Sequence, residues 1–303
     1  MACRMCPRSV RAFTGPNMDI GLFKRILDEW IPYLRYLSMD GPGETIMNPE
    51  AFDMIRYAKS RGVRVMLSTN ATLLSKDVTD ALLDSGVDLI IFSVNGASSK
   101  VYEAVHGGGN YEVTIGNIRQ FLARKLERRA PVLVSMQMVR LPETLPQIGD
   151  YYLQWHGLPG VDSVRVKKDV VCNEGTCLED SRRQRPRRNP CSRLWYGPVF
   201  VETNGDVYAS PGILYKAPPI GNLKENSLAE IWNGKRIQAM RRAHSTGHVS
   251  SLPECVDCAY PRPFLPLILA GFLVDPFTVG RLVPIAEKLA FWHSFPFFEK
   301  IGK

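Results

Sequence analysis

The chain has 303 residues, of which 45% are hydrophobic and 22% are charged, a balance typical of a folded globular protein. Its formal net charge of +8 comes in part from one basic run, residues 182–188, so the excess alone does not indicate a nucleic-acid-binding surface. The longest apolar stretch, residues 264–274, is too short for a membrane-spanning helix. The composition therefore excludes a disordered chain and a chain that crosses a bilayer.

The seven cysteines form two C-x-x-C pairs, Cys3 with Cys6 and Cys255 with Cys258, and three single positions, Cys172, Cys177 and Cys191. An odd number of cysteines, with two close pairs, favours thiolate ligation over a secreted disulfide framework. No charged-then-apolar signal peptide opens the sequence. We therefore expect a reducing, cytoplasmic setting.

Apolar runs of strand length alternate with amphipathic segments in the first half of the chain, at residues 34–39, 63–67, 87–92, 132–136 and 161–166. Asn48 before Pro49 predicts the start of one intervening helix, and Gly62 predicts its end. Ser75 and Gly86 bracket the next helix. This alternation predicts parallel strands joined by right-handed crossovers, in an α/β barrel or an open sheet.

Polar residues follow these apolar runs, at Gly43-Glu44, Thr69-Asn70, Ser93 to Asn95, and Arg140. In parallel α/β folds the carboxyl ends of the strands meet at one edge, where binding and catalytic residues gather. The sequence therefore predicts a functional site at that edge of the sheet.

The pattern changes after the basic run, which we expect to be an exposed linker. Two short apolar segments within residues 199–209 flank an Asn204-Gly205 turn, and this predicts a β-hairpin. Ser227 and Glu230 have the spacing of a capping box, opening a helix that we expect to continue through Trp232 and Ile237.

The residues from 264 onward form an apolar tail. A helix there would carry Val279, Leu282, Ala286, Leu289 and Ala290 on one face. We expect this face to cover the core, and the alternative is peripheral contact with a membrane surface or a partner.

Together these motifs resemble the radical S-adenosylmethionine (radical SAM) enzymes that carry a C-terminal SPASM or twitch domain. In that family three thiolates of a C-x3-C-x2-C motif, placed after the first barrel strand, hold a [4Fe–4S] cluster. The fourth iron of the cluster binds S-adenosylmethionine. Cys3 and Cys6 are similar to the second and third cysteines, and the first would lie two residues before Met1. The resemblance thus implies a sequence shortened at its N-terminus, without the first strand.

The resemblance also implies which residues bind the cofactor: Gly43, Glu44, Thr69, Asn70, Ser93, Gln137 and Arg140. Glu44 is similar to the family's glutamate that receives the ammonium group of S-adenosylmethionine, as a carboxylate acceptor suits a cationic donor. Ala71 stands where the family usually has a glycine after the Thr-Asn pair. Ser93 corresponds to a serine near the ribose, while Gln137 and Arg140 are placed to reach the carboxylate.

The second half resembles a SPASM or twitch module through its hairpin and through Cys191, Cys255 and Cys258, which would be metal ligands. After the hairpin the family usually carries a cysteine, but here the chain has Ala209-Ser210. Because Fe–S clusters are usually held by four thiolates, an auxiliary cluster would need another ligand. The candidates are Cys172, Cys177, Ser210 or an exogenous group. The alternative is that this cluster has been lost and Cys191 is a buried small residue.

The implied fold class is α/β, a partial (β/α)6 TIM-like barrel lacking its first strand, followed by a small α+β SPASM/twitch domain and a C-terminal helical tail. The expected boundaries are 1–180 for the radical SAM core, 181–190 for the basic linker, 191–262 for the SPASM/twitch-like domain and 263–303 for the apolar tail.

The implied function is that of an Fe–S oxidoreductase that generates a 5′-deoxyadenosyl radical for hydrogen abstraction. Its partners would be S-adenosylmethionine, an electron donor such as flavodoxin or ferredoxin, and a substrate, with a peptide or protein preferred over a small molecule. Nucleic acid is not expected. Two rival functions stay open: a degenerate relative that keeps the barrel as a binding scaffold, and a structural zinc protein that uses the two C-x-x-C pairs.

Overall fold

The computed structural model describes residues 1–6, 15–34, 36–41, 43–168, 191, 193–210 and 217–256. Cys172, Cys177, Cys258, the basic linker and the apolar tail lie outside these ranges, so the expectations for them stay predictions. Among the described residues, no helix combines the length and the apolar character needed to cross a bilayer.

The larger part of the fold is a five-stranded parallel sheet with the strand order β2-β3-β4-β6-β7. Its strands are β2 (Tyr36–Met39), β3 (Arg64–Thr69), β4 (Leu89–Ser93), β6 (Leu133–Arg140) and β7 (Ser163–Lys168). Each of the predicted apolar runs forms one strand of this sheet, and the strands are neighbours in chain order. The prediction of a parallel α/β sheet is therefore confirmed.

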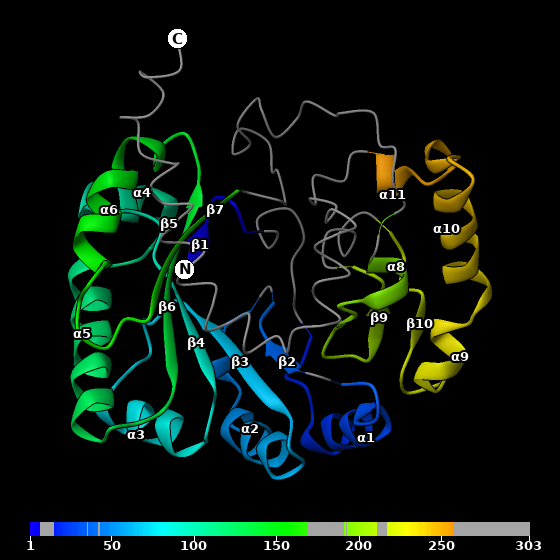
Figure 1. Ribbon diagram of the computed structural model, residues 1–303, viewed down its shortest axis with the longest axis horizontal. Helices are drawn as coiled ribbons and strands as arrows, with labels where there is room; N and C mark the ends of the chain where they lie inside the picture. Colours follow the sequence, from blue (N-terminus) through cyan, green and yellow to red (C-terminus); the bar gives the residue numbers. More distant parts are fainter. Residues whose placement is uncertain are drawn as a thin grey trace.

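Helices pack against one face of the sheet (Figure 1). They are α2 (Ala51–Ser60), α3 (Lys76–Asp84), α4 (Ser99–Val105), α5 (Tyr111–Glu127) and α6 (Ile148–Trp155), and α1 (Ile20–Trp30) lies beside α2. In β3 the residues that face these helices, Val65, Leu67 and Thr69, are buried, and the alternate residues are less so. This period of two is the one expected for a strand whose faces meet different surroundings.

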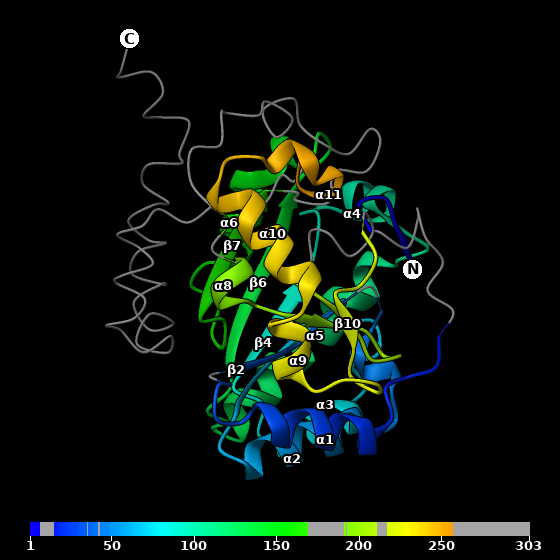
Figure 2. The same cartoon turned by 90° about the vertical axis from the view of Figure 1, so that its right-hand side faces the viewer.

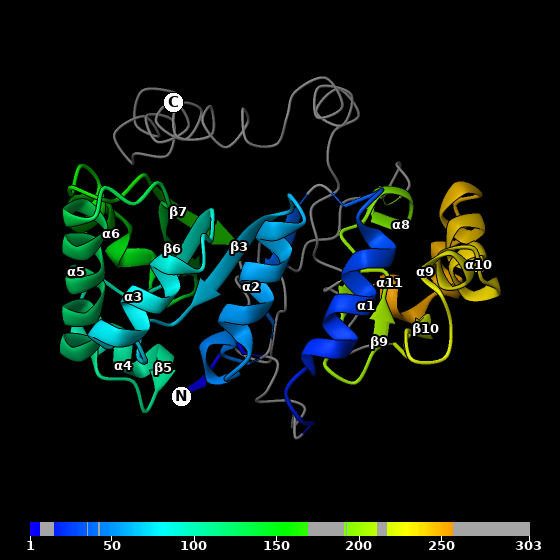
Figure 3. The same ribbon diagram turned by 90° about the horizontal axis from the view of Figure 1, so that it is seen from below.

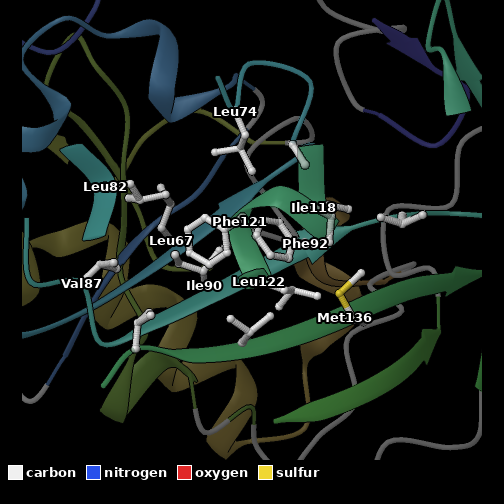
Figure 4. Close-up of a cluster of buried hydrophobic side chains, with 14 of the residues drawn as sticks. Leu67, Leu74, Leu82, Val87, Ile90, Phe92, Ile118, Phe121, Leu122 and Met136 are labelled. Atoms are coloured by element: carbon white, nitrogen blue, oxygen red, sulfur yellow. The ribbon is translucent and has the colours of Figure 1, made fainter. Parts of the chain in front are cut away.

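The main core lies between the sheet and α5 (Figure 4). Ile90 and Phe92 of β4 pack against Ile118 and Phe121 of the helix, and all four side chains are fully buried. The rings of Phe92 and Phe121 meet edge to face with their centroids 5.3 Å apart, a favourable arrangement of two aromatic quadrupoles. This core fixes the sheet that carries the candidate site.

The predicted ends of α3 and the predicted stop of α2 at Gly62 are confirmed, and the predicted start of α2 is corrected. The Ser75 side chain accepts a hydrogen bond from Val78 N–H at 3.2 Å and so caps α3. Helix α2 begins at Ala51, whereas the Asn48-Pro49 pair predicted an earlier start. The reason is local, because Asn48 Oδ1 accepts from Glu50 N–H at 3.0 Å and the segment forms a turn before the helix.

A second, smaller unit follows. It contains a three-stranded antiparallel sheet of β8 (Phe200–Val201), β9 (Asp206–Tyr208) and β10 (Gly221–Asn222). Its helices are α8 (Arg193–Tyr196), α9 (Leu228–Trp232), α10 (Lys235–Ser245) and α11 (Pro253–Val256). The predicted hairpin is confirmed as β8 and β9. The turn needs Gly205, whose φ of 93° is in the left-handed region.

The capping box of Ser227 and Glu230 is present at the start of α9, as predicted. The prediction of a single helix through Trp232 and Ile237 was wrong, because the chain forms two helices with a break at Asn233-Gly234. Gly234 has extended backbone angles, φ −68° and ψ 165°, and serves as the N-cap of α10. An extended residue interrupts the i to i−4 hydrogen-bond ladder, so α9 ends there.

Helix α1 connects the two units (Figure 3). On its outer side Ile26 and Trp30 pack with Val207, Leu223 and Ile231 of the smaller unit. Two hydrogen bonds add to this contact, from the Arg25 guanidinium to Leu223 O at 3.3 Å and from Leu228 N–H to the Glu29 carboxylate at 2.6 Å. Figure 2 shows α1 and α2 side by side at the base of the molecule.

Candidate functional site

The predicted cofactor-binding residues share one edge of the sheet. Because β2, β3, β4 and β6 are parallel, their carboxyl ends meet there. Ser93 of β4 is the register partner of Gln137 of β6. Thr69 ends β3, and Gly43 and Glu44 follow β2. The structure thus brings these residues to the same side of the fold, and their roles stay predictions.

Glu44 has the most informative surroundings of this set. Its Oε2 accepts a hydrogen bond from Asn70 N–H at 2.9 Å, which ties the segment after β2 to the end of β3. Its Oε1 is buried and has no hydrogen-bond partner among the described residues. Burial raises the pKa of Glu44, and the Asn70 N–H makes the largest of several hydrogen-bonding contributions that lower it. A buried carboxylate oxygen without a donor is costly, so it is suited to receive a ligand's N–H group.

The loop after β3 is held in a fixed shape. Asn70 Oδ1 accepts from Thr72 N–H at 2.9 Å and from the Thr72 hydroxyl at 2.5 Å. Ala71 adopts a φ of 61°, a left-handed conformation that a glycine adopts without strain. This explains in physical terms why the family prefers glycine here. Asn117 of α5 donates to Ala71 O at 3.0 Å and supports the loop from below.

Arg140 and Gln137 lie near the end of β6. The Arg140 Nε is buried and has no hydrogen-bond partner among the described residues, as expected of a donor that awaits an anionic group. The Gln137 main-chain carbonyl accepts from Val94 N–H at 2.9 Å, so the segment after β4 stays next to β6.

The first C-x-x-C pair lies at the same end of the fold. Cys3 belongs to β1 (Ala2–Cys3), which pairs antiparallel with β5 (His106–Gly107), and Cys6 N–H donates to Cys3 O at 3.0 Å to close a turn. Met5 packs against Val139 and Leu141, where β6 ends. Burial, and then the neighbouring Cys6, raise the pKa of the Cys3 thiol to about 11. A metal must therefore displace the proton of this thiol on binding.

His106 also belongs to this site, although no sequence motif identified it. Its side chain is only 2% exposed, and its Nδ1 lies 3.1 Å from the Cys3 sulfur. Burial lowers the pKa of His106 to about 4, so the ring is neutral at physiological pH. A single histidine beside a glycine-rich segment carries no motif. Only the pairing of β1 with β5 brings it to the cysteine.

In the smaller unit the structure brings two of the three predicted ligands together. Cys191 and Cys255 pack in one apolar cluster with Ala209, and Ser210 follows as a buried residue. Cys191 N–H also donates to His244 Nδ1 at 3.3 Å. The described residues contain no group of three or more His, Cys, Asp or Glu side chains that would hold a metal ion, and Cys258 lies outside them.

Comparison with known families identifies the class of protein. Residues 1–152 match the sequence model of the Radical SAM superfamily, and residues 191–259 match SPASM, an iron–sulfur cluster-binding domain. The chain belongs to the radical SAM superfamily and carries a SPASM domain. The resemblance seen in the sequence is therefore confirmed.

Individual relatives support this assignment. The chain is 37% identical over 257 residues to the tungsten-containing aldehyde ferredoxin oxidoreductase cofactor-modifying protein of Pyrococcus furiosus, covering 81% of this chain and 69% of that protein. The solved structure of anSMEcpe with bound AdoMet matches with a TM-score of 0.61 and 11% identity, over 84% of this chain and 81% of that one. Streptococcus suis SuiB bound to its precursor peptide SuiA matches with a TM-score of 0.60 and 15% identity, over 85% and 66%. These two structures share the fold.

A radical SAM domain implies a [4Fe–4S] cluster and S-adenosylmethionine, and a SPASM domain implies auxiliary Fe–S clusters. The residues at the sheet edge fit these groups. Cys3 and Cys6 supply two adjacent thiols, and the unpartnered Glu44 Oε1 supplies an acceptor for a cationic amine. The third thiolate of the family's cluster is not among the described residues. The alternative of a four-thiolate zinc site loses support, because the two C-x-x-C pairs belong to different parts of the fold. Cys255 packs in the apolar cluster of the smaller unit, whereas the Cys3–Cys6 turn packs against the end of β6.

Proposed function

We propose that this chain is a radical SAM enzyme that abstracts a hydrogen atom from its substrate. The observation that carries the proposal is the buried, unpartnered Glu44 Oε1 at the strand edge that also holds the Cys3–Cys6 turn, in a chain of this superfamily. When bound, the cluster and S-adenosylmethionine supply one-electron cleavage of a carbon–sulfur bond and the 5′-deoxyadenosyl radical.

The chain's own residues have supporting roles in this proposal. Glu44 receives the ammonium group of the cofactor, and Asn70 N–H keeps the carboxylate oriented for it. Arg140 offers a buried guanidinium N–H to the cofactor's carboxylate, with Gln137 beside it. We assign Ser93, the register partner of Gln137, to the ribose. These polar groups orient the cofactor and keep bulk water from it.

Two substrate classes are compatible with the relatives. Modification of a cofactor is favoured by the 37% identity to the cofactor-modifying protein of Pyrococcus furiosus, which extends over both domains. A peptide or protein, the class preferred from the sequence, is compatible with the fold shared with SuiB. An electron donor such as flavodoxin or ferredoxin completes the proposed reaction.

The test is reductive cleavage of S-adenosylmethionine. The reconstituted full-length protein, incubated anaerobically with dithionite, is expected to release 5′-deoxyadenosine and methionine, detected by mass spectrometry. Cys3→Ala removes an iron ligand and is expected to abolish the product. Glu112→Gln, which alters an exposed carboxylate of α5, is the matched control and is expected to keep it. Absence of 5′-deoxyadenosine from a protein with a full cluster would leave the binding-scaffold alternative.

A second test concerns the SPASM unit. We expect the Cys3→Ala/Cys6→Ala protein to retain iron and sulfide, held by Cys191 and Cys255 with Cys258. Adding Cys255→Ala should remove that iron, because one thiolate of the cluster is lost. Ser210→Ala, Cys172→Ala and Cys177→Ala, each made separately, identify the fourth ligand by further loss of iron.

Elemental analysis and the visible absorbance of the purified proteins measure the outcome. If the Cys3→Ala/Cys6→Ala protein contains no iron, the SPASM unit has lost its cluster, and Cys191 and Cys255 are apolar packing residues.

A further inference from the structure

A chain of buried hydrogen bonds leads from the sheet to Cys3. The Asn95 Oδ1 accepts from Val139 N–H at 2.7 Å, in the segment where β6 ends. Asn95 N–H and Nδ2 both lie at hydrogen-bond distance from His106 Nε2, at 3.1 Å and 3.0 Å. His106 Nδ1 then lies 3.1 Å from the Cys3 sulfur. Asn95 and His106 are 0% and 2% exposed, so water does not compete with these bonds.

The direction of each bond follows from chemistry. Val139 N–H can only donate, so Asn95 presents its oxygen to Val139 and its amide nitrogen to His106. Asn95 main-chain N–H can also only donate, so His106 Nε2 is the acceptor and carries no proton. With Nε2 unprotonated, the ring carries its N–H on Nδ1. That N–H group is the one directed at the Cys3 sulfur.

The ring is held in this orientation from its face as well. The Tyr102 ring packs against the His106 ring with a centroid distance of 4.4 Å and an interplanar angle of 30°. The main chain is fixed by the β1–β5 pairing, in which Cys3 and His106 are register partners. In Figure 1 β1 and β5 lie side by side. The donor is therefore built in before any cofactor binds.

We propose that His106 is a positioning residue that donates an N–H···S bond to the Cys3 thiolate and thereby raises the reduction potential of the [4Fe–4S] cluster. The inference rests on the proposed function, since it requires a cluster on Cys3. Hydrogen bonds to ligand sulfurs set the potentials of Fe–S clusters, because they stabilise the additional negative charge of the reduced state. Asn95 acts through His106, by holding the proton on Nδ1.

Two amide substitutions separate the donor from the rest of the side chain. In His106→Asn the terminal amide lies near the position of Nδ1 and keeps a donor for Cys3. In His106→Gln the longer side chain reaches the position of Nε2, where its oxygen serves Asn95, and the donor to Cys3 is lost. His106→Phe removes both nitrogens but keeps a ring against Tyr102. Tyr102→Phe is the control, because it keeps the ring against His106 and removes only the hydroxyl, which bonds to Thr114 and to the Met1 sulfur.

The measurement is a redox titration of the reconstituted full-length proteins, followed by electron paramagnetic resonance of the reduced cluster, with iron and sulfide determined in parallel. At a fixed potential we expect the reduced-to-oxidised ratio to fall several-fold in His106→Gln and His106→Phe. It should stay near the unmodified value in His106→Asn and Tyr102→Phe. A tenfold fall corresponds to about 59 mV for a one-electron couple.

The outcomes are distinguishable. Equal potentials in His106→Asn and His106→Gln, at full iron content, overturn the role of His106 and leave the proposed function intact. Loss of iron from all three His106 variants also overturns it, because the histidine then only holds the β1–β5 turn. If only His106→Gln and His106→Phe lose iron and His106→Asn keeps its full iron content, the result supports the need for a donor at the position of Nδ1. Absence of a cluster from the unmodified protein contradicts the proposed function itself.

Discussion

Replacing Glu44 with alanine is expected to weaken the binding of S-adenosylmethionine by about 2–5 kcal/mol, the usual cost of truncating one member of a buried charge pair. This corresponds to a rise in Kd of roughly thirty-fold to several thousand-fold. The reason is that Glu44 Oε1 is buried without a partner, so it has an open position for the cofactor's ammonium group. Anaerobic titration calorimetry of the reconstituted protein measures the change.

The cluster should be unaffected by this substitution, because Glu44 is not an iron ligand. Visible absorbance and iron content are therefore expected to match those of the unmodified protein. Glu112→Gln, in the exposed first turn of α5, serves again as the control and should bind the cofactor normally. Unchanged affinity in Glu44→Ala would remove Glu44 from the cofactor site.

Phe121→Ala is expected to lower the free energy of unfolding by about 3–5 kcal/mol, the range for truncating a large aromatic residue in a core. Phe121 is fully buried in the middle of α5, where its ring meets Phe92 of the central strand (Figure 4). Its removal leaves a cavity that the sheet and helix together cannot readily close. Urea denaturation followed by circular dichroism measures the loss.

Leu126→Ala provides a matched control on the same helix. Leu126 is 47% exposed, and alanine and leucine have similar helix propensities, so its loss should stay within about 0.5 kcal/mol. Similar losses for the two substitutions would show that the contact between α5 and the sheet contributes little to stability.

The strands of the sheet were predictable because each is a short apolar run between clear breaks. Gly62 and Gly86, with φ values of 78° and 76°, end α2 and α3 where the chain must turn back into a strand. The Ser75 cap and the Ser227–Glu230 capping box were predictable for a similar reason, since each depends on contacts within a few residues. Local chemistry therefore sufficed for most of the architecture.

Features that depend on distant contacts were not predictable. The break between α9 and α10 is a different case, because Asn233-Gly234 is a local helix-ending signal that the expected single helix ran through. His106 meets Cys3 across 103 positions of the chain, through a pairing of two very short strands. Such strands have too few residues to show a hydrophobic period.

The candidate site was predictable only in part. The order of Glu44, Asn70 and Ser93 along successive strand ends was informative because parallel topology converts that order into proximity. The bond from Asn70 N–H to Glu44 Oε2 was not predictable, since it depends on how the 3-10 turn after β2 directs the carboxylate. The sequence does not identify the fourth ligand of a SPASM cluster, because Ser210, Cys172 and Cys177 all remain candidates.

Helix α1 belongs to two cores at once. Through Phe23 and Leu27 it packs in the main core, and through Ile26 and Trp30 it packs against the apolar cluster of the SPASM unit. Melting of the small unit would strip these side chains of their cover and loosen α1 from the large one. The two units are therefore expected to unfold as one cooperative block, with a single calorimetric transition, although the sequence models divide them into two domains.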